Sequence, residues 1–450
     1  MSKYKKIVIV KSDLNIYLNL FVVTIFILLG TYNSVFSYLA LLFAIIQLLI
    51  TPITTNAYIL FYIMNFSSIF KASPDSFSFF TLLFIVFVIK YMVKKKISTF
   101  EVNLLLFMIF LIIMQYIHSG TIDILKTIKF FVSMEFIFYI WDDRKKLNVY
   151  ILMKVYSLGV IIASLIAFGA NPNLFKINEY ILKQNFKYGN VFIGRFSGLY
   201  SDPNYYGVNV IIAMCLLIIL YYSNRLKLSL FLTEFFALMF FAINTYSKSV
   251  FFMLLIPLSL IFYILFKKRH YFLSITLLAI GFILLGFIFR GEITKVNMII
   301  YRLKGTRLSN LKDNLNYITT GRIDLWETYL DRILHEYKYL YFGRGINYPI
   351  IGDLAEHNTF IQLVYYFGII GTVWFFFMLL SLKGRYQASR NYLNYSVLFT
   401  VLLMYCFLSE LFYFDAPFHL ALCLLTIDIN LNPQKSNESL DDNVWLKKYY

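Results

Sequence analysis

Charged residues are scarce in this 450-residue chain, and their scarcity argues against a soluble fold. Asp, Glu, Lys and Arg together make up 14% of the sequence, whereas hydrophobic residues make up 60%. A soluble globular domain is about a quarter charged and about half apolar. Apolar runs of about 20 residues recur along the whole chain, which is the length that crosses a hydrocarbon layer roughly 30 Å thick. The sequence therefore predicts an all-α, polytopic integral membrane protein.

Cysteine is also scarce, and the positions of the three cysteines argue against two kinds of site. Cys215, Cys406 and Cys423 all lie in apolar segments. Their spacing matches neither a disulfide framework nor a zinc site. Aspartates do not cluster as a metal site would require, and the sequence has no glycine-rich phosphate loop. We therefore expect neither a metal ion nor another cofactor.

Hydropathy predicts 12 to 14 transmembrane helices, because each apolar run is about long enough to cross the membrane once. The basic segment from Met1 to Lys11 precedes an apolar run without a small-residue cleavage site, which indicates a retained first span and not a removed signal peptide. The second, third and last spans are short. The expected spans cover residues 14–30, 35–50, 56–70, 77–93, 100–118, 122–141, 148–168, 204–222, 226–243, 248–266, 271–289, 358–381, 393–412 and 415–430.

The formal charge is +17, and the positions of the basic residues agree with the order of these spans. When the N-terminus is placed in the cytoplasm, every dense basic cluster in a short loop falls on the cytoplasmic side, as the positive-inside rule requires. The positive charge therefore indicates topology in a bacterial cytoplasmic membrane, with both termini inside, and nucleic acid is not an expected partner. The clusters are Lys94–Lys96, Arg144–Lys146, Arg225 with Lys227, Lys267–Arg269, and Lys383 with Arg385 and Arg390.

The expected spans divide the chain into four parts. Residues 1–289 carry the first eleven expected spans, 290–357 form one large extracytoplasmic loop, 358–430 carry the last three spans, and 431–450 form a cytoplasmic tail. The second part of the loop predicts a short amphipathic helix, which Gly343 and Gly345 end. Its apolar residues recur at i, i+3 and i+4 spacing: Leu325, Trp326, Tyr329, Leu330, Ile333, Leu334 and Tyr337.

One polar signature on the expected outer face runs from Gly194 to Gly207 and contains Arg195 and the sequence Asp202-Pro203-Asn204. Pro203 suits the first turn of a helix, and Asp202 suits its N-cap. A guanidinium beside the bilayer, as at Arg195, suits bidentate binding of phosphate or carboxylate. The alternative for Arg195 is an arginine that extends its charge to the interface.

Two further cations on the expected outer face lie at helix starts. Lys248 begins an apolar helix, where it is either an interfacial anchor or a point charge for an anionic head group. Arg322 precedes the amphipathic helix that contains Trp326, and it would reinforce an anion site at the helix N-terminus. Asp324 favours the first turn of the same helix. The alternative for Arg322 is a solvated loop arginine.

The last signature combines Gly343-Arg344-Gly345 with Glu356-His357-Asn358 at the mouth of the next span. A lone histidine is more often structural, but a histidine at an outward cavity near several cations is a candidate general base. Neighbouring cations also favour its neutral form. Glu135 and Glu234 lie inside spans and are candidates by default, unless tyrosine or lysine partners satisfy them.

These signatures together resemble the O-antigen polymerase and O-antigen ligase superfamily (Wzy-type polymerases and WaaL-type ligases). Residues 195–207 resemble its R…G…DPN…G pattern, and Ser247-Lys248-Ser249 is similar to its S-R-[GS] motif, with lysine in place of the usual arginine. The segment from Gly321 to Trp326 resembles the GR…W start of its large loop. The order G-x-G, HN, G-x-x-G is found at Gly343–Gly345, His357-Asn358 and Gly368–Gly371. The resemblance covers residues 190–375.

The resemblance implies a glycosyltransferase that acts on polyprenyl-pyrophosphate-linked oligosaccharides outside the membrane, by inversion and without a metal. The favoured interpretation is a polysaccharide polymerase, for O-antigen, capsule or another exopolysaccharide. His357 would be the general base, and Arg195, Arg322 and Arg344 would bind pyrophosphate with help from Lys248. Asp202, Asn204, Asn358 and Trp326 would shape the substrate site. Expected partners are membrane lipid, the lipid-linked donor, a flippase and a chain-length regulator.

Two other functions stay open at this point. An O-antigen ligase-like enzyme would share the donor and the motifs but would use a different acceptor. A lipid-linked oligosaccharide flippase belongs to another class and also has about fourteen spans. A flippase needs charge along a cavity through the membrane, whereas here the charged signatures gather at one face. The sequence does not separate the two enzyme functions.

Overall fold

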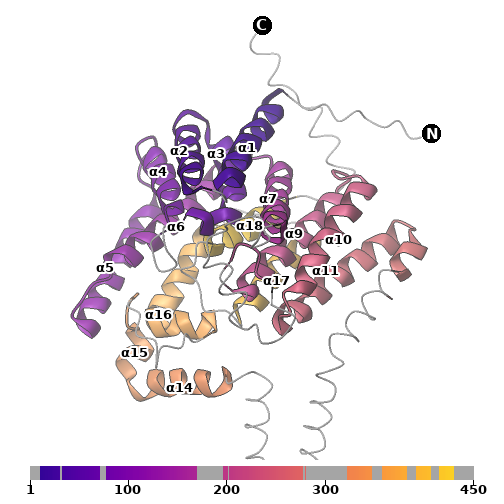
Figure 1. The fold of residues 1–450 in the computed structure, drawn as a ribbon. Helices are drawn as coiled ribbons and strands as arrows, with labels where there is room; N and C mark the ends of the chain where they lie inside the picture. Colours follow the sequence, from indigo (N-terminus) through magenta and orange to yellow (C-terminus); the bar gives the residue numbers. More distant parts are fainter. Residues whose placement is uncertain are drawn as a thin grey trace, which may run out of the picture.

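The computed structural model describes most of the chain as helices that pack into one bundle (Figure 1). It describes residues 11–30, 33–70, 78–169, 196–200, 202–276, 279, 322–346, 357–382, 392–406 and 415–429. Within these ranges the secondary structure consists of helices without a strand. The predicted all-α class is therefore confirmed.

The helices follow the hydropathy pattern along the chain. The first part forms α1 (Lys11–Gly30), α2 (Ser34–Ile50), α3 (Ile53–Ile63), η1 (Met64–Phe70), α4 (Phe80–Met92), α5 (Thr99–Ser119), α6 (Ile124–Asp142), η2 (Arg144–Lys146) and α7 (Val149–Gly169). The second part forms α9 (Pro203–Tyr222), α10 (Leu228–Asn244), α11 (Lys248–Lys267), α14 (Arg322–His335), α15 (Tyr337–Phe342), α16 (Thr359–Leu382), α17 (Tyr392–Tyr405) and α18 (Asp415–Asp428).

Every expected span other than 271–289 contains a described helix, and residues 271–289 lie mostly outside the described residues. Among the described helices, α5, α7, α9, α11 and α16 are long and apolar enough to cross a membrane. Several shorter apolar helices accompany them, among them α2, α4, α10, α17 and α18. A polytopic membrane protein is the class that these helices support.

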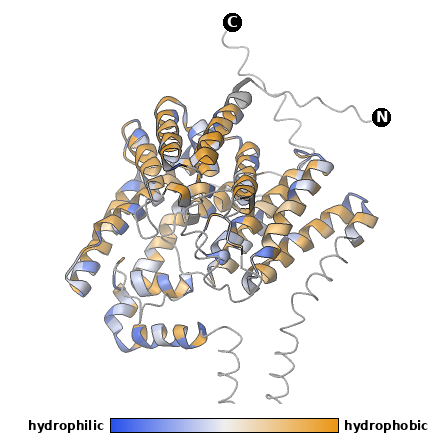
Figure 2. Ribbon diagram, viewed as in Figure 1, coloured by the Kyte–Doolittle hydropathy of each residue, from blue (hydrophilic) through white to orange (hydrophobic). Residues whose placement is uncertain are grey.

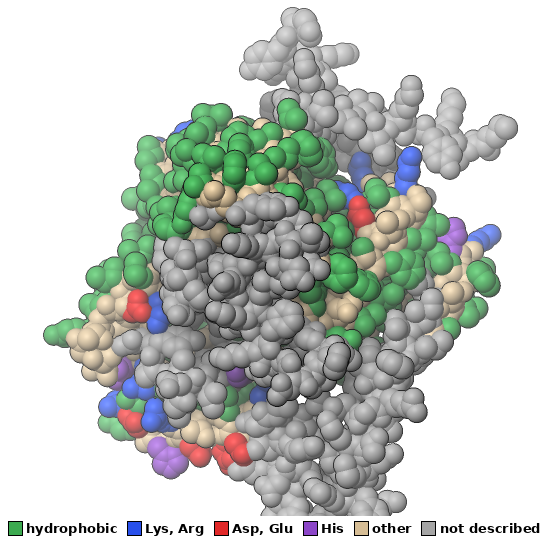
Figure 3. Space-filling view, in the orientation of Figure 1, with side chains coloured by type: hydrophobic (Ala, Val, Ile, Leu, Met, Phe, Trp, Pro, Cys, Tyr) green, Lys and Arg blue, Asp and Glu red, His purple; other side chains and the backbone are tan. Residues whose placement is uncertain are grey.

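Helix α9 forms the centre of the bundle. It packs against α7, α10, α11 and α17, and 89% of its apolar window is buried inside the protein. Outer helices instead expose large apolar side chains, such as Phe21 on α1 and Leu105 on α5. Figures 2 and 3 show this apolar surface, with charged side chains gathered along the lower edge near α14 and α15. Exposed apolar area of this kind suits contact with lipid tails.

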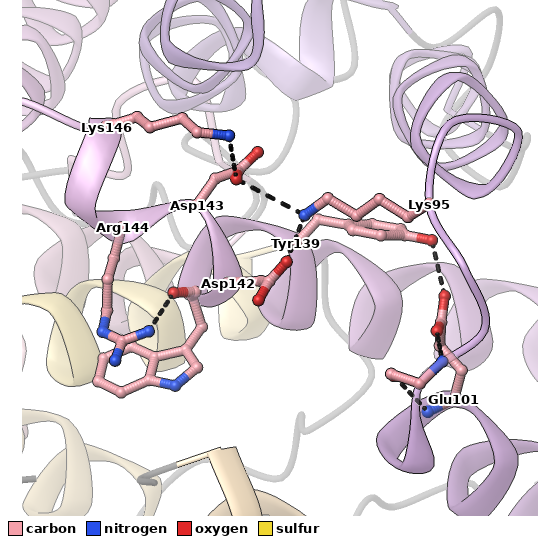
Figure 4. A network of polar contacts seen from close by, with 9 residues as sticks. Lys95, Glu101, Tyr139, Asp142, Asp143, Arg144 and Lys146 are labelled. Atoms are coloured by element: carbon pink, nitrogen blue, oxygen red, sulfur yellow. Dashed lines mark hydrogen bonds and ion pairs between the residues drawn. The ribbon is translucent and has the colours of Figure 1, made fainter. Parts of the chain in front are cut away.

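Two of the predicted cytoplasmic basic clusters lie side by side (Figure 4). Lys95, between α4 and α5, contacts Asp142 at 2.5 Å and Asp143 at 3.6 Å. Lys146 contacts Asp143 at 2.8 Å, and this ion pair raises the pKa of Lys146. The guanidinium of Arg144 lies 4.0 Å from the centre of the Trp141 ring. The two clusters are therefore neighbours in the structure, joined through Asp143.

The amphipathic segment of the large loop is helical, as predicted, but it forms two helices where the sequence pattern predicts one that continues to Gly343. Tyr329 and Ile333 of α14 are buried, and the Tyr329 ring meets the Tyr365 ring of α16 edge-on at 5.1 Å. Helix α15 follows directly and ends at Phe342, where Gly343 has a φ of 69°. Helices α14 and α15 thus lie along the first half of α16.

The expected continuous span at 358–381 is interrupted at Gly368, which has a φ of 65° and a ψ of −178°. The interruption comes from a close crossing of two backbones. A Cβ atom at Gly368 would lie 2.5 Å from the Gly343 nitrogen, and one at Gly343 would lie 2.4 Å from the Gly368 nitrogen. Both positions therefore need glycine for conformation and for space.

We predict that Gly368→Ala destabilises the protein much more than Gly120→Ala. Both glycines have a positive φ, but Gly120 has a ψ of −2°, whereas Gly368 has a ψ of −178°, a combination that is essentially restricted to glycine. Nothing lies within 4 Å of a Cβ atom at Gly120. At Gly368 the added carbon meets backbone atoms that cannot move alone. Melting temperatures of the two purified variants in detergent measure the difference, and equal shifts would contradict the crossing.

Candidate functional site

The predicted helix start at Asp202-Pro203 is confirmed, and it leads directly into the central helix. Asp202 is the N-cap of α9 and accepts a hydrogen bond from the backbone N–H of Asn204 at 2.5 Å, while Pro203 occupies the first turn. Proline suits this place because the first N–H groups of a helix have no partner within it. The rigidity of α9 thus fixes the place of Asp202 and Asn204.

Asn204 joins the starts of two helices. Its side-chain oxygen accepts a hydrogen bond from the Ser247 hydroxyl at 2.5 Å, and Ser247 is the N-cap of α11. One turn further along α9, a Cβ atom at Gly207 would lie 2.0 Å from Val250, so α9 and α11 approach each other closely. Lys248 is the first residue of α11, next to Ser247, and its side chain lies outside the described residues.

Arg322 is the first residue of α14, whereas the sequence pattern places it just before the helix. Its side chain is half-buried, and Asp324 lies in the first turn as expected. Trp326 lies one turn further and is also half-buried. A cation at this end adds its charge to the positive end of the helix dipole, so the start of α14 favours an anion.

His357 precedes α16 in a strained backbone conformation, with a φ of 46°. Left-handed φ values are uncommon for residues other than glycine, and they are often found at functional sites. The next residue, Asn358, caps α16, because its side-chain oxygen accepts hydrogen bonds from the backbone N–H groups of Phe360 at 2.9 Å and Ile361 at 3.2 Å. Asn358 thus stabilises the start of α16.

Two predicted site residues from distant parts of the sequence, Arg322 and Asp202, lie near enough to His357 to act on its charge. Burial and the positive charge of Arg322 lower the pKa of His357, and the negative charge of Asp202 partly opposes them. Charges act on an imidazole in this way only at short range. The starts of α9, α14 and α16 therefore lie in one region, where a guanidinium and burial favour the neutral form of the His357 imidazole.

Arg344 has aromatic partners. Its guanidinium donates a hydrogen bond to the Tyr365 hydroxyl at 2.5 Å and lies 4.8 Å from the centre of the Tyr339 ring. The sequence pattern did not predict these partners.

Arg195 lies outside the described residues, which resume at Phe196. The backbone N–H of Phe196 donates to the Asn244 carbonyl at 2.9 Å, and its ring stacks on Phe241 with 5.7 Å between ring centres. The segment that follows Arg195 is thus held against the end of α10.

The two acids predicted inside spans differ from each other. Glu234 forms an ion pair with Lys154 through one carboxyl oxygen, while its other carboxyl oxygen is buried without a hydrogen-bond partner. Glu135 is fully buried, and neither of its carboxyl oxygens has a hydrogen-bond partner. Within the described ranges, no three His, Cys, Asp or Glu side chains gather closely enough to hold a metal ion.

Sequence reasoning missed the residues that hold the cations in place. Tyr339 and Tyr365 position Arg344, but nothing marks them among the 37 tyrosines of the chain. Ser247 was noticed within a motif, but its bond to Asn204 depends on the packing of α9 against α11. A serine before an apolar helix does predict an N-cap, which is the one signal that was available.

We predict that the pKa of His357 is below its ordinary value of about 6.5, rises in Arg322→Gln and falls in Asp202→Asn. Removing the guanidinium removes a cause that lowers this pKa, whereas removing the carboxylate removes the cause that raises it. Asparagine is as good an N-cap as aspartate, so Asp202→Asn keeps the start of α9.

Modification by diethyl pyrocarbonate, which reacts with neutral imidazole, measures this pKa. The rate at His357 would be followed by mass spectrometry across a pH series in the full chain. A midpoint at or above 6.5 in the unchanged protein, or one that does not respond to Arg322→Gln, would refute the arrangement.

Comparisons with known proteins find no match for this chain: no protein-family model, no curated protein and no solved structure matches it. What the site does must therefore be inferred from its own residues.

Proposed function

We propose that this protein is a membrane glycosyltransferase of the polysaccharide polymerase type. It would transfer a growing glycan from a polyprenyl-pyrophosphate carrier to a lipid-linked repeat unit at the outer face of a bacterial cytoplasmic membrane. The observation that supports this most is the electrostatic influence of Arg322 and Asp202 on His357, which places three distant helix starts in one region. The order of motifs that resembles the O-antigen polymerase and ligase superfamily supports it further.

His357 has the properties that a general base needs in this reaction. A lowered pKa keeps its imidazole neutral near pH 7, so a ring nitrogen is free to accept the proton of an attacking sugar hydroxyl. General base catalysis of this kind is typically worth ~10²–10⁴ in rate. The strained backbone at His357 fits a residue whose orientation matters more than its local stability.

Arg322 would bind the leaving group. In the proposed step, the acceptor oxygen forms a bond to the anomeric carbon while the bond from that carbon to the pyrophosphate oxygen breaks, with inversion. The electron pair leaves with the lipid pyrophosphate, and the hydroxyl proton passes to His357. A guanidinium at the start of α14 stabilises the negative charge that develops on the pyrophosphate.

The remaining predicted residues take supporting roles in this proposal. Lys248 at the start of α11 and Arg195 would add positive charge for the diphosphate. Asp202 and Asn204 hold the start of α9 beside α11, and Asn358 holds the start of α16. Trp326 would contact a sugar. The polyprenyl chain of the donor would lie among membrane lipids, and a flippase and a chain-length regulator would be the protein partners.

We predict that His357→Ala and Arg322→Gln each lower the rate of polymer formation by ~10²-fold or more, because each removes a group that acts on the transition state. Arg332→Gln is the matched control, since Arg332 is an exposed arginine on the same helix. The measurement is the product ladder that purified protein forms from defined lipid-linked repeat units. Wild-type ladders from both variants would refute the assignment.

A deletion strain separates the polymerase from its two rivals. Single repeat units on the cell surface are expected for a lost polymerase. Long chains that stay on their lipid carrier would indicate the ligase instead. Undecorated precursor that accumulates on the inner leaflet would indicate a flippase.

A further inference from the structure

Two other predicted basic clusters meet where α9 and α11 end. The Lys268 ammonium, at the C-cap of α11, donates to the Tyr221 carbonyl at 2.8 Å and to the Asn224 side chain at 3.0 Å. The Lys267 ammonium donates to the Tyr222 hydroxyl at 3.3 Å. These bonds join the two chain segments that carry the α9–α11 basic patch, which consists of Arg225, Lys227, Lys267, Lys268 and Arg269.

The basic patch has no acidic counterpart among the described residues. None of its five cations forms an ion pair with a carboxylate there, and the segments 221–227 and 263–271 contain no Asp or Glu. The other pair of basic clusters differs, because Lys95 and Lys146 both contact Asp143 (Figure 4). Acids thus offset part of the charge in those clusters, whereas the α9–α11 basic patch keeps its full charge.

Aromatic rings hold two of these cations in place. The Lys268 ammonium lies 3.9 Å from the centre of the Tyr221 ring, and the Arg225 guanidinium lies 5.0 Å from the centre of the Tyr150 ring. Such contacts position a cation without cancelling its charge. Burial lowers the pKa of Lys268 to about 8, because its ammonium has lost water without gaining a counter-charge from the described residues. An anion beside the patch would supply that counter-charge.

Arg269 occupies a backbone position that suits glycine. Its φ is 64°, and the next backbone N–H, that of His270, donates to the Leu265 carbonyl at 2.8 Å. A helix that ends in this way usually has glycine at the left-handed position, because any other side chain is strained there. Asn224 holds the same position at the end of α9, and asparagine tolerates it better. The arginine thus adds a cation to the patch at the expense of stability.

Large apolar side chains border the patch. Tyr263 and Phe266 on α11 are exposed, and Phe272, three positions after Arg269, is 85% exposed. Aromatic rings beside basic residues are typical of the boundary between a membrane and water. Rings of this kind suit the upper part of lipid chains, and the cations beside them suit lipid head groups.

We propose that the α9–α11 basic patch binds the phosphate groups of anionic phospholipids. The leaflet is the one at this end of the bundle, which the charge pattern predicts to be the cytoplasmic leaflet. Helix α9 has 20 residues, so its end lies about 30 Å from its start at Asp202. The patch is therefore separate from the candidate site, and the inference does not depend on the proposed function.

Native mass spectrometry of the full chain in a neutral detergent tests this proposal. The protein would be titrated with phosphatidylglycerol and, separately, with phosphatidylcholine of the same chains. We expect the first phosphatidylglycerol to bind at least fivefold more tightly, because its head group has a net negative charge. Equal affinity for the two lipids would overturn the proposal.

A pair of double variants locates the binding. Arg225→Gln with Arg269→Gln should remove most of the preference for phosphatidylglycerol. Lys145→Gln with Lys146→Gln is the matched control, because it removes the same charge from two exposed lysines that follow Asp142 and Asp143. This control should keep the preference, and an equal loss in both double variants would overturn the assignment to the α9–α11 basic patch.

Arg269→Gly separates binding from folding. Glycine suits the left-handed conformation, so the melting temperature in neutral detergent should stay the same or rise. The preference for phosphatidylglycerol should nevertheless fall severalfold, and a full preference in this variant would overturn the proposal. Inorganic phosphate in excess should not displace the lipid, whereas displacement would indicate a site for a soluble anion and overturn the lipid assignment.

Discussion

The crossing of the chain at Gly343 and Gly368 is the contact on which the candidate site depends. It interrupts α16 and holds the end of α15 against the point of interruption. Helix α14, which precedes α15 directly, then lies along the first half of α16 with Tyr329 against Tyr365. The start of α14 consequently reaches the start of α16, and Arg322 comes to act on His357. A side chain at either glycine would separate the backbones and with them these two groups.

The second constraint is the need of helix ends for polar partners where water is scarce. The first N–H groups of each helix have no partner within it. Asp202, Ser247 and Asn358 supply such partners for α9, α11 and α16. Because the starts of α9 and α11 are joined and the start of α9 lies near His357, several positive helix ends lie in one region. This arrangement favours a ligand of high negative charge, and a diphosphate is such a ligand.

Local patterns in the sequence were enough for much of this architecture. Runs of apolar residues predicted the helices, Asp202-Pro203 predicted the start of α9, and the spacing from Leu325 to Tyr337 predicted α14. The charge pattern placed the candidate residues on one face, but it did not predict the partners of Arg344. One partner is Tyr365, which lies 21 positions from Arg344 in the sequence. The interruption of α16 was missed for the same reason, since it arises from contact with a separate loop.

The burial of α9 has a consequence for how the protein is made. The helix is apolar on all sides, although in the finished bundle other helices cover nearly all of it. During synthesis α9 enters the membrane before α10, α11 and α17 exist. Its side chains therefore contact lipid first and the neighbouring helices later. Lipid tails are as apolar as these neighbours, so hydrophobicity does not drive the exchange. Close fit and buried hydrogen bonds drive it instead, as where Gly207 admits Val250 and Asn209 bonds to Tyr156 and His419. Assembly of the centre thus depends on shape and on a few polar pairs.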